Sequence, residues 1–173
     1  MSDESVPPVE PTVNIERYSQ LIAELEMKQS LVGALVAGLV ASIVGAAIWA
    51  GITIATEYQI GWVAIGIGFL VGFAVRILGK GINMQYGIIG GAFALLGCVL
   101  GNFFAIVGFV SIQEGLGFFE LLFAIDYAYI PEIMMEAFHP MDLLFYGLAI
   151  YAGYKFSFRP LKPEEVEQVI DTE

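Results

Sequence analysis

Residues 66–102, GIGFLVGFAVRILGKGINMQYGIIGGAFALLGCVLGN, carry the strongest signal about the architecture of this chain. The stretch holds ten of the chain's twenty glycines. Two basic residues, Arg76 and Lys80, lie near its middle, and long uncharged segments flank them. A glycine inside a helix in water costs about 1 kcal/mol relative to alanine. Helices so rich in glycine would be unstable in water, so we look to the rest of the chain for a different environment.

The composition of the chain is that of an integral membrane protein. Hydrophobic residues make up 58% of its 173 residues, charged residues only 14%, and the mean hydropathy is +0.77. A soluble domain carries about a quarter charged residues, so this chain lacks the polar surface that water requires. Its apolar residues form uncharged blocks at 31–56 and 85–113. Because about 20 helical residues cross the roughly 30 Å hydrocarbon core, these blocks predict membrane spans.

The pattern predicts an all-α membrane protein, a four-transmembrane-helix bundle. Its spans are expected at about 31–55, 60–78, 86–110 and 141–157. The fourth is the shortest and begins after His139-Pro140, where a proline at the first helical position and Asp142 two residues later favour a helix start.

The segments outside this membrane domain, which we place at 31–158, are acidic. Residues 1–14 contain three prolines and several acids and predict a disordered acidic arm. Residues 15–30 have apolar residues at helical spacing, which predicts an amphipathic cytoplasmic helix leading into the first span without a break. Residues 159–173 form an acidic cytoplasmic tail. The acidic N-terminus is not typical of a cleaved signal peptide.

The distribution of basic residues predicts the orientation of the spans. With four spans, all seven Lys and Arg lie on one side of the membrane: Arg17, Lys28, Arg76, Lys80, Lys155, Arg159 and Lys162. The loops on the other side contain acids and no Lys or Arg. Because Lys and Arg in short loops mark the cytoplasmic side, we expect both termini in the cytoplasm, N-in and C-in. Arg76 and Lys80 then mark the cytoplasmic turn between the second and third spans.

Small residues recur in the spans at the spacing of helix contacts. In lipid no hydrophobic force drives helices together, so contact requires small residues that let backbones approach. The predicted packing rows are Ala64, Gly68 and Gly72; Gly87 and Gly91; Gly97, Gly101 and Ala105. The short turn at 79–85 predicts a hairpin in which the glycine faces of spans two and three meet, with one face of span three left for span one or another subunit. Glycine is also frequent in membrane helices generally, so a single row carries little weight.

Charged residues are missing from the centre of every predicted span, which argues against a proton-coupled transporter or an intramembrane hydrolase. The polar residues there are Ser42, Thr53, Cys98 and Asn102. We expect Asn102 to form an interhelical polar contact and Cys98 to be a small packing residue. The GKG at 79–81 lacks the remaining residues of a phosphate loop. No catalytic residue and no cofactor are assigned, and the chain is expected not to be an enzyme.

Residues 111–140 form a long connection that is nevertheless apolar and aromatic. This composition predicts an interfacial or re-entrant helical segment between the third and fourth spans. Its end, MMEAFHPM at 134–141, allows a weaker interpretation. Met134, Met135, His139 and Met141 are weak candidates for a Cu(I) site, because soft thioether ligands select that ion.

The segments GWVAIGIGFLVGFAVRILGKG, 61–81, and DLLFYGLAIYAGYKFSFRP, 142–160, resemble a group of small bacterial four-span membrane proteins of unknown function. The resemblance covers roughly residues 57–160. It rests on Gly61, Ala64, Gly66, Gly68, Gly72, Ala74, Arg76, Gly81, Asp142, Leu143, Tyr151, Tyr154 and Lys155. It implies an inner-membrane location in a bacterium and no catalytic activity.

These observations leave three functional hypotheses. The first is a non-enzymatic bundle in the lipid bilayer that acts as a homo-oligomer or by assembly with another membrane protein. No nucleic-acid partner is expected, because the chain has no basic face. The alternative is an oligomeric pore or small-solute channel with Asn102 or Ser42 facing a lumen. The third is copper binding by the 134–141 loop.

Overall fold

The computed structural model describes residues 12–171, whose regular secondary structure is helical apart from one pair of two-residue strands. These residues fall into two compact units. The terminal unit consists of 12–29 with 160–171, and the bundle unit consists of 30–159.

The terminal unit brings together the two ends of the described chain. It contains α1 (Ile15–Met27), α8 (Pro163–Glu167) and the antiparallel pair of β1 (Thr12–Val13) and β2 (Ile170–Asp171). Most of the predicted disordered arm, 1–14, lies outside the described residues. Its last residues do not fit that prediction, because they form β1 and the Asn14 cap of α1, whose side chain accepts a hydrogen bond from Arg17 N at 3.1 Å. The acidic tail contains α8 and β2, and its composition predicts neither of them.

Helix α1 does not continue into the first apolar helix, contrary to the prediction for 15–30. It ends at Met27, and α2 (Leu31–Thr56) begins after Ser30. Ser30 Oγ accepts a hydrogen bond from Gly33 N at 3.0 Å. A serine at this position satisfies an amide that lacks a partner in the first turn. Ser30 therefore starts a new helix at the boundary between charged and apolar sequence.

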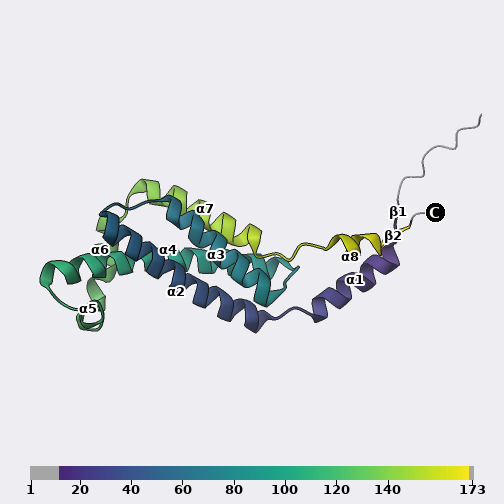
Figure 1. Cartoon of the computed structure of the whole chain (residues 1–173), viewed down its shortest axis with the longest axis horizontal. Helices are drawn as coiled ribbons and strands as arrows, with labels where there is room; N and C mark the ends of the chain where they lie inside the picture. Colours follow the sequence, from purple (N-terminus) through teal and green to yellow (C-terminus); the bar gives the residue numbers. More distant parts are fainter. Residues whose placement is uncertain (1–11, 172–173) are drawn as a thin grey trace, which may run out of the picture. The chain divides into compact units, whose positions relative to one another are not determined.

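Four helices run side by side in the bundle unit (Figure 1): α2, α3 (Trp62–Gly79), α4 (Met84–Glu114) and α7 (Pro140–Phe156). Both α2 and α7 pack against α3 and α4. Within the described residues, α2, α3 and α4 are long and apolar enough to cross a membrane, and a fourth span results if α7 and the bent segment before it count as one. The chain is therefore a helical, multi-pass membrane protein with three to four spans.

Short helices fill the connection between α4 and α7. They are α5 (Phe118–Ala124), the 3-10 helix η1 (Tyr127–Tyr129) and α6 (Ile130–Ala137). The chain bends by 103° between the segment Tyr127–Met135 and α7. The bend falls where Phe138 and His139 are extended before Pro140, because a proline disfavours a helical conformation in the residue before it.

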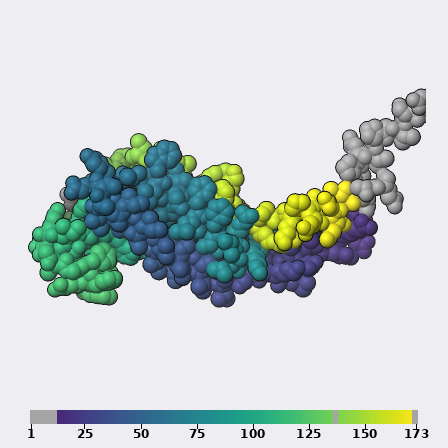
Figure 2. Space-filling view, viewed as in Figure 1, coloured from purple at the N-terminus to yellow at the C-terminus, as the bar shows by residue number. Residues whose placement is uncertain are grey.

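Helix α2 buries mostly small residues, with Trp49 as the large exception, and exposes mostly large aliphatic ones. Among its buried residues are Ala34, Ala37, Gly38, Ala41, Ser42, Gly45 and Ala46. Its exposed face consists of Leu31, Val32, Leu35, Val36, Leu39, Val40, Ile43, Val44 and Ile48. Figure 2 shows α2 and α3, in blue to teal, covering one face of the bundle. A soluble helix has the reverse arrangement, so the surroundings that suit this face are lipid.

Contact between the helices depends on glycines at which two backbones meet. A Cβ added to Gly90 of α4 would overlap the carbonyl oxygen of Gly153, which lies in α7, and Ser157 Oγ, which directly follows α7. A Cβ added to Gly68 of α3 would overlap the carbonyl oxygen of Ala149, also in α7. The row of α3 that contains Gly68 and Gly72 thus faces α7, and so does the row of α4 that contains Gly87 and Gly91. The prediction that they face each other was wrong, because the turn fixes only that α3 and α4 are neighbours.

Candidate functional site

A cluster of polar side chains joins three parts of the bundle at the end where α2 leads into α3. This polar cluster consists of Gln59 from the α2–α3 loop, Asn102 from α4, and Asp142 and Tyr146 from α7. Asp142 and Tyr146 are four residues apart, which places both on one face of α7.

Hydrogen bonds connect the four side chains in series, from Asp142 through Gln59 and Asn102 to Tyr146. Gln59 Nε2 donates to Asn102 Oδ1 at 2.8 Å and to Asp142 Oδ1 at 3.2 Å. Asn102 Nδ2 donates to the Tyr146 hydroxyl. The other carboxylate oxygen of Asp142 accepts from His139 N at 3.0 Å. The N-terminus of α7 therefore stabilises the Asp142 carboxylate, because the first amides of a helix favour a negative charge.

Aromatic rings enclose the α7 side of the cluster. Tyr146 is 8% exposed and Asp142 is 6% exposed. The rings of Trp49 and Phe138 meet the Tyr146 ring edge to face, with centroids 6.3 and 6.1 Å away. Trp49 also lies against Gly101, where an added Cβ would be 3.0 Å from its ring. Its Nε1 is buried without a hydrogen-bond partner among the described residues.

The arrangement favours a structural role for these polar groups. In a low-dielectric interior each unpaired polar group costs about 1–3 kcal/mol, so groups that satisfy one another fix the helices that carry them. The cluster holds the α2–α3 loop, α4 and α7 together. Asn102 thus lies in an interhelical hydrogen bond to Tyr146.

All eight predicted packing residues are buried. The glycines among them face α7 and the residues after it, α2, or α3. Gly68 and Gly72 of α3, and Gly87 and Gly91 of α4, face α7 or the residues that follow it. Gly97 and Gly101 of α4 face Ser42 and Trp49 of α2, with Ile67 of α3 also near Gly97. Ala64 and Ala105 are 0% and 5% exposed.

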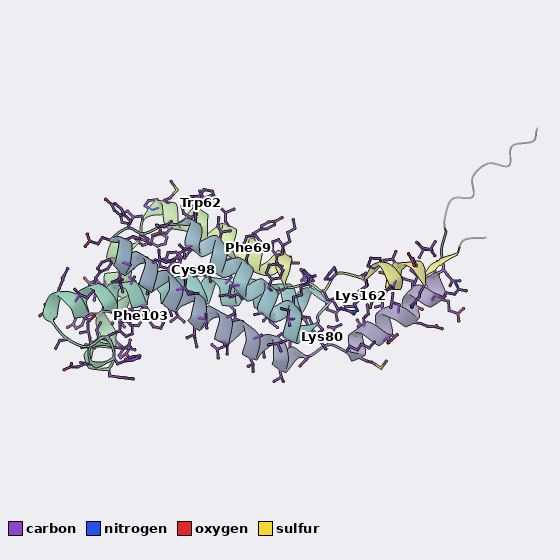
Figure 3. All side chains as sticks on the ribbon, in the orientation of Figure 1. Trp62, Phe69, Lys80, Cys98, Phe103 and Lys162 are labelled. Carbon is purple, nitrogen blue, oxygen red and sulfur yellow. The ribbon has the colours of Figure 1, made fainter. Side chains whose placement is uncertain are left out.

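The remaining polar residues of the spans lie within helix contacts. Ser42 Oγ donates to Gly38 O at 2.6 Å or to Phe93 O at 2.7 Å, so it lies between α2 and α4. Cys98 is fully buried in the core, near the middle of the bundle in Figure 3. Thr53 is 6% exposed. Ser42 and Asn102 therefore face other helices of their own chain.

The candidate copper ligands lie in different surroundings. Met134 lines a small apolar cavity with Phe103 and Ile106 of α4. Met135 and Met141 are 78% and 60% exposed, and His139 is exposed at the start of α7. The described residues include no group of three or more His, Cys, Asp or Glu side chains able to hold a metal ion.

The two predicted topology residues lie at the opposite end of the bundle from the polar cluster. Figure 3 shows Lys80 at this end and Trp62 toward the other. Lys80 ends α3 in a left-handed conformation, with φ 51°. Arg76 lies over the Phe73 ring, 5.9 Å from its centroid.

The sequence pattern does not identify Gln59, Tyr146 or Trp49 as members of a site, and it indicates Asp142 only as part of a helix start. One signal was available, because Asp142 and Tyr146 share a helix face with the spacing of a polar pair. The contribution of Gln59 was not accessible, since it depends on where the α2–α3 loop meets α7. Comparisons with protein-family models, curated proteins and solved structures give no match to this chain.

The cluster predicts that Asn102→Ala lowers the free energy of unfolding in detergent micelles by about 1–2 kcal/mol, since Gln59 and Tyr146 both lose a partner. Titration with sodium dodecyl sulfate measures this. In the double variant with Tyr146→Phe, the loss should be smaller than the sum of the single losses, because both changes remove the same bond. Tyr58→Phe, at a site 75% exposed, is the control and should change stability by less than about 0.5 kcal/mol. Strictly additive losses would show that the cluster does not act as a unit.

Proposed function

We propose that this chain is a non-enzymatic membrane protein that acts by assembling with a second copy of itself through a groove between α2 and α3. The groove has a volume of about 280 Å³ and is lined by Gly45, Ile48, Val63, Gly66, Ile67 and Leu70. It is the observation that carries the proposal, because the predicted packing rows of α3 and α4 are buried against other helices of the same chain, whereas Gly66 is open.

Gly66 gives this groove its depth. It is exposed, and an added Cβ would meet no atom within 4 Å. At Gly45, by contrast, an added Cβ would lie 3.1 Å from the Ile67 side chain, so the floor of the groove is closed by the chain itself. An open glycine between larger aliphatic residues is the kind of hole into which a side chain of another membrane helix packs.

The outer face of α2 supplies side chains that fit such a hole. Its exposed Val40 and Val44 are aliphatic, and they lie two turns and one turn before the groove-lining Ile48 on the same side of the helix. A surface that carries both a hole and suitable ridges is self-complementary, as a two-fold dimer requires. A helix of a different membrane protein is the competing occupant.

The topology proposed with this function is four spans with both termini in the cytoplasm of a bacterial inner membrane. Ser30 N donates to Gly79 O, and Arg159 N donates to Gly81 O, both at 2.8 Å. These bonds gather Arg76, Lys80, Lys155 and Arg159 at one end of the bundle unit. The acids Glu57, Glu114 and Asp142 belong to the other end. This segregation supports the orientation derived from Lys and Arg.

The α5–α6 segment is proposed to lie at the outer interface. Phe119 and Phe123 are 70% and 80% exposed, and Tyr127 and Tyr129 are more than half exposed. Aromatic side chains favour the depth of the lipid headgroups. Phe118 anchors the segment to α4 by an edge-to-face contact with Phe104 at 6.0 Å.

Reporter fusions test the topology. An alkaline phosphatase fusion after Gln59 or after Glu120 should be active, and fusions at either terminus should be inactive, because that enzyme folds only outside the cytoplasm. A cytoplasm-specific reporter at the same four sites should give the opposite pattern. Active phosphatase at a terminus, or inactive phosphatase at both loop sites, would contradict the proposed orientation.

Energy transfer between labelled copies in liposomes tests the assembly. Gly66→Leu fills the groove and should weaken association at least tenfold at equal protein-to-lipid ratio, because the inserted side chain occupies the hole. Gly51→Leu is the matched control, since Gly51 is also exposed and its added Cβ meets nothing within 4 Å. This control should associate like the wild type.

Two results would contradict self-assembly through this groove. One is a wild-type chain that stays monomeric at the highest protein density tested. The other is equal association of the Gly66→Leu and Gly51→Leu variants. A different membrane protein that is retained by the wild type and lost only from Gly66→Leu would reassign the groove to that partner.

A further inference from the structure

A second groove, between α4 and α7, differs from the α2–α3 groove in having a basic residue at its end. It has a volume of about 530 Å³, and its lining is almost wholly apolar. Its walls are formed by Ile88, Gly91 and Leu95 of α4 and by Gly147, Ile150 and Tyr151 of α7. We propose that this groove binds the acyl chain of one anionic phospholipid, whose phosphate pairs with Lys155.

The absence of side chains at two glycines keeps the groove open. Gly147 is exposed, and an added Cβ would meet no atom within 4 Å. Gly91, across from it, has Ile150 as its nearest neighbour, 3.3 Å from an added Cβ. The groove is therefore a gap between two helices that touch through Gly90 and Gly153 just beneath it.

The length and position of the groove suit one leaflet. From Gly147 to Tyr154, α7 rises about 10 Å, which fits within the half-thickness of a roughly 30 Å hydrocarbon core. These residues are the C-terminal half of α7, and Ile88 to Leu95 are near the start of α4. Both walls thus lie toward the basic end of the bundle. An acyl chain in the groove would have its headgroup at that end.

Charge at the mouth of the groove selects the headgroup. Lys155 Nζ lies over the ring of Tyr151, 5.6 Å from its centroid, and Tyr151 lines the groove. Every acid within residues 30–159 belongs to the α2–α3 loop or to the stretch 114–142, toward the opposite end of the bundle. Within the bundle unit the charge at the mouth of the groove is therefore positive. A positive charge favours an anionic headgroup, whose phosphate carries the net charge, over a zwitterionic headgroup, whose own cation neutralises the phosphate.

Native mass spectrometry of the full chain in detergent tests the proposal. The probes are phosphatidylglycerol and phosphatidylcholine with identical acyl chains. The wild type should retain one phosphatidylglycerol about fivefold more tightly than phosphatidylcholine, the effect expected of one lysine near a headgroup. Lys155→Gln should abolish this preference. Lys80→Gln is the control, because Lys80 ends α3 rather than α7, and it should keep the preference.

Filling the groove tests the acyl-chain part of the proposal. Gly147→Leu should reduce the retention of both lipids, and Ala92→Leu, from the opposite wall, provides an independent variant if the first does not fold. Equal retention of the two lipids by the wild type would overturn the proposal, as would equal losses in Lys155→Gln and Lys80→Gln. Efficient disulfide formation between copies carrying Leu95→Cys and Cys98→Ala in phosphatidylglycerol vesicles would assign the groove to a second copy instead.

Discussion

Close backbone contact between helices is the constraint on which this structure depends. In lipid, a large aliphatic side chain gains little by moving from the outside of a bundle to its interior, so burial cannot hold helices together as it does in water. Contact area and interhelical hydrogen bonds have to do so instead. The contact of Gly90 with Gly153, and of Gly68 with Ala149, brings α7 against both α4 and α3. The glycines that would weaken a soluble helix are therefore what permits this bundle to pack.

The same constraint explains where polar groups and grooves occur. Polar side chains inside the bundle pair with one another, as in the cluster of Gln59, Asn102, Asp142 and Tyr146, or with backbone carbonyls, as Ser42 does; Trp49 Nε1 is an exception. A glycine that another helix covers becomes a contact, whereas an uncovered glycine leaves a hole. Gly66 and Gly147 are of the second kind. The two grooves that they open differ in charge, since Lys155 lies at the end of only one. That difference is why we propose a protein helix for one and an anionic lipid for the other.

The sequence predicts the spans well and their pairing poorly. Hydropathy and the absence of charge locate α2, α3 and α4, because crossing a membrane imposes a length and a polarity on each helix by itself. Which faces meet depends on all the helices at once. The small-residue rows therefore identified Gly68 and Gly91 as packing positions without indicating that both face α7. The same rows passed over Gly66, which differs from Gly68 only in lying on the other face of α3. The break at Ser30 and the contribution of Gln59 to the polar cluster depend on local capping and loop placement, which periodicity does not report.

The helix contacts, the grooves and the orientation all require the large aliphatic face of α2 to contact lipid. Spin labels attached at Ile43→Cys and Tyr58→Cys, each in a Cys98→Ala background in liposomes, test it by their accessibility to oxygen and to a water-soluble nickel complex. Ile43 lies on the exposed face near the middle of α2, and Tyr58 lies in the α2–α3 loop. The label at 43 should be accessible to oxygen and protected from nickel, while the label at 58 should be accessible to nickel. A label at 43 as accessible to nickel as the label at 58 would mean that this face is in water, which would contradict a membrane-spanning α2.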